Sequence, residues 1–213
     1  MKPALLDKKL RYPRSWSVLP SGIERKAIVE AELDEITQQF FGYHLVKVGN
    51  LSSELSLSKC SIKHCVNMVA KEHENASMRS LSRDMALKEN SVDGFVLAHE
   101  LDFAQDPHQI LREVDRAIMP DGDLVIVGFN PLSLTGLRKL VWFNSQSLLH
   151  EARFFSVPRI KDWLHLLGFE VTLVRYRPYT KLFTARPNNI LIRWCQRFLP
   201  QLASVYIIVA KKR

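Results

Sequence analysis

Several features that assign proteins to special classes are absent from this chain. Its apolar runs fall well short of the roughly 18 to 20 uncharged residues that a membrane-spanning helix needs. The first residues include Lys2, Lys8 and Lys9 and form no apolar stretch of the kind that a secretory signal peptide carries. Together these absences predict a protein that stays in the cytoplasm.

Cysteine is scarce and shows no pattern. The chain has three cysteines, Cys60, Cys65 and Cys195, with no C-x-x-C pair and no second pair at the spacing of a zinc site. His64 adds one more metal-ligand type but has no partner pair, so we interpret it as structural. The sequence therefore predicts buried free thiols, without a disulfide framework or a metal site.

The composition is that of an ordinary globular protein. Of 213 residues, 46% are hydrophobic and 24% are charged, which is too apolar for a disordered chain. A chain of about 200 residues commonly folds around one core. We therefore expect a single domain over residues 1–213, without internal repeats.

Charge is distributed unevenly. Residues 1–26 carry a net charge of +5 and residues 153–213 a net charge of +10, whereas the residues between them are acidic. We expect residues 1–26 to form a basic extension, and residues 178–200, where aromatic and basic side chains interleave, to form an irregular insertion before the last strand. Basic ends attract nucleic acid or another polyanion. Basic ends can also serve only to keep a protein soluble. Residues 190–199 equally suit a helix that covers the sheet and leaves its arginines in water.

Hydrophobic periodicity predicts alternating helices and strands. Residues 27–41 form an amphipathic pattern that indicates a helix ending at Gly42. Residues 71–91 are polar and indicate mostly loop. Apolar runs too continuous for half-exposed strands indicate strands buried on both faces. The predicted strands cover residues 44–48, 62–70, 92–98, 124–127, 169–174 and 204–210.

The clearest unit lies between residues 92 and 127. Asp106-Pro107 provides a helix N-cap followed by proline at the first helical position, and Pro120-Asp121-Gly122 ends that helix. Strand, helix, tight turn and strand form a βαβ unit, which implies parallel strands. A second capped helix begins at Ser156 and ends at Gly168. The sequence therefore predicts an α/β fold with helices on both faces of a mostly parallel sheet.

These motifs resemble those of class I S-adenosylmethionine-dependent methyltransferases of the type 11 family. The resemblance rests on residues 90–101, 106–114 and 120–126, and the segments 128–134 and 159–171 are similar to one bacterial branch of that family. It implies a Rossmann-like sheet of seven strands, mostly parallel, with an antiparallel last strand. It also implies S-adenosyl-L-methionine as the cofactor and an unidentified methyl acceptor as the partner.

The resemblance also implies where the cofactor binds. Gly49 and Asn50 stand at the turn after the first strand, where the family binds the methionine end of the cofactor. An acid after the second strand normally accepts the ribose hydroxyls, and Glu72, or else Glu74, stands there. Ser82 is the candidate for the adenine, through its backbone.

The ends of the fourth and fifth strands hold the remaining candidates. Ala98 and His99 stand where the family contacts the methionine end and the substrate, and a histidine suits proton transfer at neutral pH. Asn130 is a second substrate-side candidate, although Asn130-Pro131 equally suits a turn. No catalytic residue is assigned, because methyl transfer to a strong nucleophile needs little beyond alignment of the reactants.

The glycine turn departs from the family pattern. Leu51 and Ser53 replace the second and third glycines. Lys47 replaces the usual acid, and Leu81 stands where an adenine-contacting aspartate is usual. Two functions therefore stay open: methyl transfer, or a degenerate relative that has kept the scaffold, lost the cofactor and serves as a polyanion- or partner-binding module. The chain lacks the G-x-G-x-x-G motif of a nicotinamide-dependent dehydrogenase.

Overall fold

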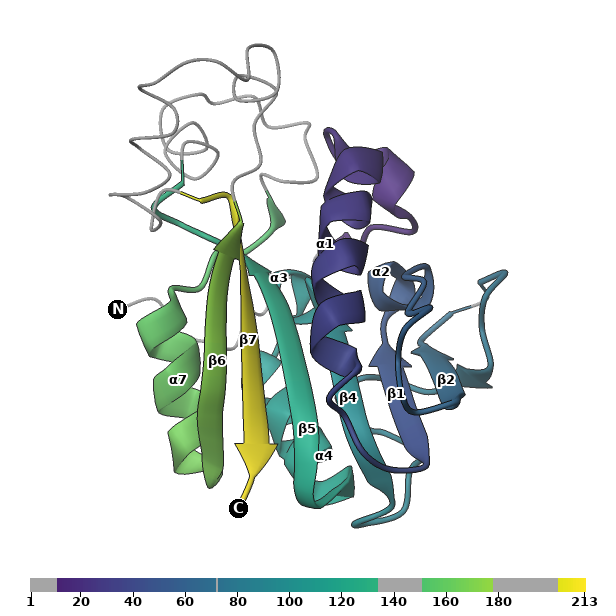
Figure 1. Cartoon of the computed structure of the whole chain (residues 1–213). Helices are drawn as coiled ribbons and strands as arrows, with labels where there is room; N and C mark the ends of the chain where they lie inside the picture. Colours follow the sequence, from purple (N-terminus) through teal and green to yellow (C-terminus); the bar gives the residue numbers. More distant parts are fainter. Residues whose placement is uncertain (1–10, 72, 134–150, 178–202) are drawn as a thin grey trace.

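A seven-stranded sheet forms the centre of the molecule (Figure 1). The computed structural model describes residues 11–71, 73–133, 151–177 and 203–213. The strand order is β3-β2-β1-β4-β5-β7-β6. The strands are β1 (His44–Val48), β2 (His64–Val69), β3 (Met78–Arg79), β4 (Val92–Ala98), β5 (Ile118–Phe129), β6 (Phe169–Arg177) and β7 (Val205–Lys212).

The last strand runs against all the others. The pairs from β3 through β5 are parallel, whereas β7 pairs antiparallel with both β5 and β6. The predicted Rossmann-like sheet, mostly parallel with an antiparallel last strand, is therefore confirmed. The carboxyl ends of β1 to β5 meet at one edge, which is where open α/β sheets bind ligands.

Helices cover both faces of the sheet. Helix α1 (Gly22–Thr37) lies on one face, and α4 (Pro107–Ala117) and α7 (Val157–Leu166) lie on the other (Figure 1). Two short helices, α2 (Asn50–Ser53) and α3 (Glu100–Phe103), directly follow β1 and β4. Their position at the carboxyl edge of the sheet makes them part of the candidate site.

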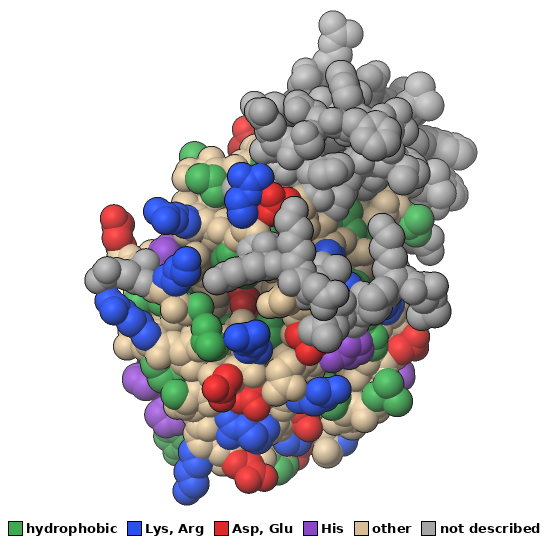
Figure 2. Space-filling view, turned by 180° about the vertical axis from the view of Figure 1, so that it is seen from behind, with side chains coloured by type: hydrophobic (Ala, Val, Ile, Leu, Met, Phe, Trp, Pro, Cys, Tyr) green, Lys and Arg blue, Asp and Glu red, His purple; other side chains and the backbone are tan. Residues whose placement is uncertain are grey.

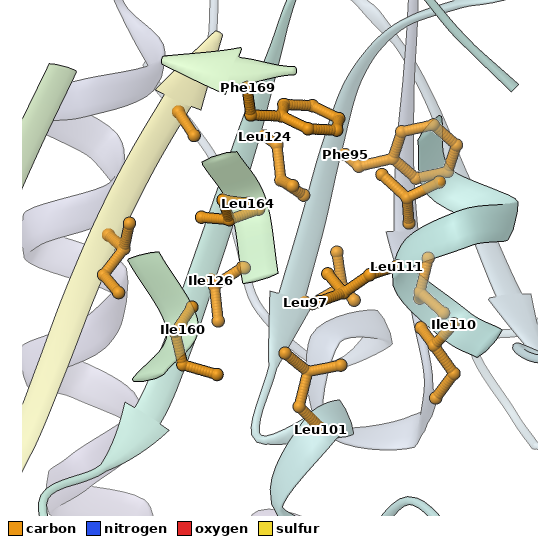
Figure 3. Close-up of a cluster of buried hydrophobic side chains, with 14 of the residues drawn as sticks. Phe95, Leu97, Leu101, Ile110, Leu111, Leu124, Ile126, Ile160, Leu164 and Phe169 are labelled. Atoms are coloured by element: carbon orange, nitrogen blue, oxygen red, sulfur yellow. The ribbon is translucent and has the colours of Figure 1, made fainter. Parts of the chain in front are cut away.

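Two buried clusters hold the layers together. The cluster under α4 and α7 is shown in Figure 3, and its labelled members are Phe95, Leu97, Leu101, Ile110, Leu111, Leu124, Ile126, Ile160, Leu164 and Phe169. The cluster under α1 combines Val29 and Leu33 of that helix with inward-facing strand residues such as Leu45 and Val125. Strands with apolar residues toward both clusters account for the continuous apolar runs in the sequence.

The βαβ unit forms as predicted at its start and differs at its end. The Asp106 side chain accepts hydrogen bonds from the backbone N–H groups of His108 and Gln109, so it caps α4. The Pro-Asp-Gly segment was predicted to precede the strand, but β5 already begins at Ile118. The register between β4 and β5 shifts across this segment, and Asp121 has a φ of 61°. The Pro-Asp-Gly segment therefore forms a bulge within β5, and the strand continues through it.

Helix α1 is displaced toward the amino terminus relative to the predicted range. The pattern predicted residues 27–41, whereas the helix spans Gly22–Thr37. Phe40 is buried but the Phe41 side chain is 93% exposed, so Phe41 does not belong to the apolar face that its spacing indicated. The predicted insertion at residues 178–200 lies outside the described residues.

In the part of the chain that the structure describes, no helix has the length and apolar character to cross a membrane. Within the same residues, no group of three or more histidine, cysteine, aspartate or glutamate side chains is placed to hold a metal ion. Cys60 is a buried free thiol and Cys65 a half-buried one, while Cys195 lies outside the described residues.

Candidate functional site

The turns after β1 and β4 lie side by side at the carboxyl edge of the sheet. Val48 pairs with Leu97, which brings the next residues, Gly49 and Ala98, together. The Ala98 N–H donates to Ser52 Oγ at 2.8 Å, and the Gly49 N–H donates to the Met68 carbonyl of β2 at 2.8 Å. The turn after β1 is therefore tied to both neighbouring strands.

Gly49 is in close contact with two polar side chains. Its φ is +89°, a conformation that favours glycine. A Cβ at this position would overlap the Glu100 carboxylate and the Tyr12 hydroxyl. Glu100 Oε2 and Tyr12 Oη are both buried and have no hydrogen-bond partner among the described residues. Two unpartnered polar atoms thus lie against one backbone position.

An amino-terminal segment covers this turn, and we call residues 11–19 the strap. Trp16 of the strap is 1% exposed, and its Nε1–H donates to the Leu51 carbonyl at 2.8 Å. The Asn50 side-chain amide donates to the Pro13 carbonyl at 3.2 Å. The strap is therefore anchored to the residues that directly follow Gly49.

His99 forms a buried pair with Asp102. Its Nδ1 lies 2.8 Å from Asp102 Oδ2, which also accepts the Phe129 N–H at 3.0 Å. The imidazole stacks on the Phe129 ring with centroids 3.9 Å apart. An ionised carboxylate only accepts hydrogen bonds, so Nδ1 is the donor and Nε2 carries a lone pair. Nε2 is buried and unpartnered among the described residues.

Burial shifts the pKa values of the neighbouring residues His99 and Glu100 in opposite directions. It lowers the pKa of His99 below the ordinary value, an effect that opposes the hydrogen bond to Asp102, so the imidazole is neutral at neutral pH. Burial also raises the pKa of Glu100 from 4.5 to about 8. At pH 7 Glu100 is therefore mostly a neutral carboxylic acid.

The substitutions in the glycine turn face the core under α1. Leu51 is fully buried in the cluster that contains Val29 and Leu33 of α1. The Lys47 side chain is 8% exposed, and its Nζ donates to the Leu55 carbonyl at 2.8 Å. Lys47 therefore stabilises the segment after α2 and supplies no acid next to Gly49.

The remaining candidates are spread along the same edge. Ser82 is half-buried and follows β3, which is two strands away from β1. Glu72 lies outside the described residues, and Glu74 is exposed. The Asn130 amide donates to the Ala203 carbonyl at 2.8 Å and accepts the Leu132 N–H at 3.1 Å. Asn130 thus forms the turn that its sequence also suits.

A hollow of about 230 Å³ lies at the other end of the sheet. Asp93, near the start of β4, and Gly122 and Asp123, from the bulged turn of β5, are among its lining residues. Because open α/β sheets bind ligands at the carboxyl ends of their strands, we place the candidate site at Gly49 and not here.

Basic residues near the carboxyl terminus are paired with acids. Arg175 donates hydrogen bonds to Glu32 and Glu35 of α1 at 3.1 and 2.8 Å, and Arg177 forms an ion pair with Glu32 at 2.6 Å. On the face seen in Figure 2, acidic and basic side chains of the described residues are interspersed. The net charge of this region therefore overstates the positive charge that these two arginines offer to a polyanion.

Replacing Gly49 by alanine is expected to destabilise the protein more than the same change at Gly168. Gly168 also has a positive φ, +80°, but a Cβ there would meet no atom within 4 Å. Gly168→Ala should therefore cost only the backbone strain of about 1–2 kcal/mol. Gly49→Ala should cost about 1–3 kcal/mol more, because the methyl group displaces Glu100 and Tyr12. Urea denaturation measures both, and equal losses would contradict this close packing.

Comparison with known proteins places this geometry in a family. Residues 48–126 match the family model of the methyltransferase domain. YafS of Escherichia coli (strain K12), described as uncharacterized, is 36% identical over 213 residues, which cover 100% of this chain and 86% of YafS.

Solved structures share the fold at low identity. A SAM-dependent methyltransferase of Thermotoga maritima, described as a possible histamine N-methyltransferase, has a TM-score of 0.63 and 17% identity over 90% of this chain and 94% of its own. A SAM-dependent methyltransferase of Archaeoglobus fulgidus has a TM-score of 0.60 and 18% identity over 88% and 94%. The [4+2]-cyclase SpnF has a TM-score of 0.58 and 12% identity over 98% and 88%. At these identities the likeness shows the fold alone.

Proposed function

Because the chain belongs to the methyltransferase-domain family, we propose that it binds S-adenosyl-L-methionine and transfers the methyl group to an acceptor. The cofactor supplies an electrophilic methyl group on a sulfonium. The protein's task is then to bind the cofactor and align the acceptor, because alignment of the two reactants can supply a large part of the rate gain.

The observation that carries this proposal is the set of buried, unpartnered polar atoms at the carboxyl edge of the sheet. These are Tyr12 Oη, Glu100 Oε2 and His99 Nε2. Buried polar groups without partners are costly, so a protein retains them where a ligand satisfies them. Two of these atoms, Tyr12 Oη and Glu100 Oε2, lie directly against Gly49, and a scaffold that had lost its cofactor would have no reason to keep them there.

The residues near Gly49 fit the methionine end of the cofactor. Gly49 has no side chain to obstruct the ligand, and Asn50 follows it at the start of α2. In this proposal Ala98 lies across from them, Glu72 accepts the ribose hydroxyls and Ser82 contacts the adenine through its backbone.

The strap has to move when the ligand binds. Tyr12 and Glu100 lie against Gly49, and Trp16 and Asn50 hold the strap over the turn. Entry therefore requires that at least Tyr12 leave its place. In this proposal the described conformation is the closed one, with the strap covering the turn.

His99 is the group that faces the acceptor in this proposal. Asp102 fixes its ring, and the neutral Nε2 has a free lone pair. Such a group can accept a proton from a hydroxyl or amine as the methyl group is transferred. The acceptor would then be a nucleophile that carries a proton, held next to Phe129.

The test is a calorimetric titration of the purified chain with S-adenosylmethionine and with S-adenosylhomocysteine. We expect dissociation constants in the micromolar range, about −8 kcal/mol at 1 μM. Gly49→Ala should weaken binding, and Gly168→Ala, at the far edge of the sheet, should leave it unchanged. No heat with either ligand at millimolar concentration would overturn the proposal in favour of a scaffold without cofactor.

A further inference from the structure

Glu100 is a buried carboxyl group that forms no ion pair with any residue that the structure describes. It is 4% exposed and directly follows His99 at the end of β4. Its Oε2 lies against Gly49 and has no hydrogen-bond partner among the described residues. Burial is the cause of its raised pKa. Such a group is costly unless it meets a cation or a donor at some stage.

Neither His99 nor Tyr12 makes a hydrogen bond to Glu100 in the described structure. The Asp102 carboxylate accepts hydrogen bonds from His99 Nδ1 and from the Phe129 N–H. The one N–H of the neutral His99 ring is therefore directed to Asp102 and not to Glu100. The Tyr12 hydroxyl shares the space over Gly49 but makes no hydrogen bond to Glu100. The Glu100 carboxyl group is therefore available to bind a ligand that enters between Tyr12 and Gly49.

A second observation concerns the charge around Gly49. Lys47 is the residue two positions before Gly49, and its ammonium group donates to the Leu55 carbonyl, so it is directed away from the glycine. No acid of β1 is therefore available to a cationic ligand beside Gly49. Glu100 follows β4 and lies against the same glycine. A carboxyl group next to Gly49 is therefore supplied by β4 and not by β1.

We propose that Glu100 binds the α-ammonium group at the aminoacyl end of the ligand, in the space now shared by Tyr12 and Gly49. The inference rests on the proposed function and adds to it the residue that recognises this end. On binding, the carboxyl group gives up its proton and pairs with the ammonium, and the Tyr12 hydroxyl moves away with the strap.

Two ligands that differ only at this end test the inference. S-adenosylhomocysteine carries the α-ammonium and carboxylate, whereas 5′-methylthioadenosine lacks the aminoacyl group. Glu100→Gln should weaken S-adenosylhomocysteine binding by about 10- to 100-fold, the range for a hydrogen bond to a charged group. Binding of 5′-methylthioadenosine should change by less than about twofold. Glu89→Gln, an exposed position at the other end of the sheet, is the matched control and should change neither.

Proton release by the unaltered protein gives a second measurement that needs no variant. Since burial raises the pKa of Glu100 to about 8, the free protein holds the proton at pH 7. S-adenosylhomocysteine should then release about one proton on binding, and 5′-methylthioadenosine none. Calorimetry in buffers of different ionisation enthalpy measures this number. Among the described residues, Tyr12 of the strap lies beside Glu100 at Gly49. His99 directly precedes Glu100 and is paired with Asp102 of α3, and the neutral His99 has no proton to lose at Nε2.

The outcomes separate the two proposals. If the unaltered chain binds both ligands, and Glu100→Gln weakens them equally or not at all without proton release, the role of Glu100 is overturned and the methyltransferase proposal stands. If the unaltered chain binds neither ligand, both are overturned. Selective loss of S-adenosylhomocysteine together with proton release is the result we expect.

Discussion

Glu100→Gln is expected to make the protein more stable than the original at alkaline pH, by up to about 5 kcal/mol. The Glu100 carboxyl group has a pKa of 4.5 when exposed and about 8 when buried in the folded chain. Each pH unit between these two values is worth about 1.4 kcal/mol. Glutamine has nearly the same shape and cannot ionise, so it removes this cost.

The sign follows from the raised pKa. Below about pH 4.5 the Glu100 carboxyl group is protonated in both the folded and the unfolded chain, so its burial does not reduce the free energy of unfolding. As the pH rises toward 8, the unfolded chain loses the proton and the folded chain keeps it, so the free energy of unfolding falls. Above about pH 8 the loss is complete. The advantage of the variant should therefore grow through this window and then level off.

Urea denaturation at several pH values between about 5 and 9 measures the effect. Glu89→Gln removes the same charge from an exposed position, so its stability should follow that of the original chain within about 0.5 kcal/mol at every pH. Parallel curves for Glu100→Gln and the original chain would mean that water or a counter-ion reaches this carboxyl group, and that it is not buried as described.

The fold could be predicted because helix caps and apolar runs in the sequence agree with the helices and strands of the structure. Asp106-Pro107 starts α4 as expected, and the apolar runs at residues 92–98 and 205–210 become strands buried on both faces. Periodicity erred at Phe41, since spacing alone cannot tell whether the chain has already left the helix. It also erred at Pro120-Asp121-Gly122, because a turn signal does not show whether the backbone resumes the strand.

The site could be predicted only in part. The resemblance pointed to Gly49, Ala98 and His99, and the pairing of β1 with β4 brings these three residues close together; their roles in binding stay predictions. Tyr12 and Trp16 were missed, since they belong to a basic segment whose composition suggested an extension, and nothing local shows that it folds back over β1. Two aromatic residues in that segment were the available signal. The burial of Glu100 was missed for the same reason: its cover comes from 88 positions earlier in the chain.

Asp102 illustrates the same limit. In the sequence, Glu100 and Asp102 are two acids that follow β4 closely. The pairing of Asp102 with His99 at three residues' distance follows from the short helix α3, which begins at Glu100. His99 adopts a φ of 56°, and no sequence signal predicted that left-handed conformation. Backbone geometry therefore decided which of the two acids orients the imidazole.

Trp16→Ala is expected to be the most damaging change in the strap, with a loss of about 3–5 kcal/mol. The indole is 1% exposed and belongs to the cluster under α1. It also meets the His99 ring edge-on at 5.4 Å. Its removal leaves a cavity and an unpartnered Leu51 carbonyl. Trp16→Phe retains most of the apolar area and should cost about 1–2 kcal/mol, chiefly the lost N–H donor.

Val18→Ala is the control within the same segment, because the Val18 side chain is 50% exposed. It should change the free energy of unfolding by less than about 0.5 kcal/mol. Urea denaturation ranks the three variants, and trypsin cleavage at Arg11 or Arg14 reports whether the strap has been released. If Trp16→Ala behaves like Val18→Ala and stays resistant to trypsin, the strap is not held by this indole. Glu100 would then need another cover to keep its carboxyl group protonated.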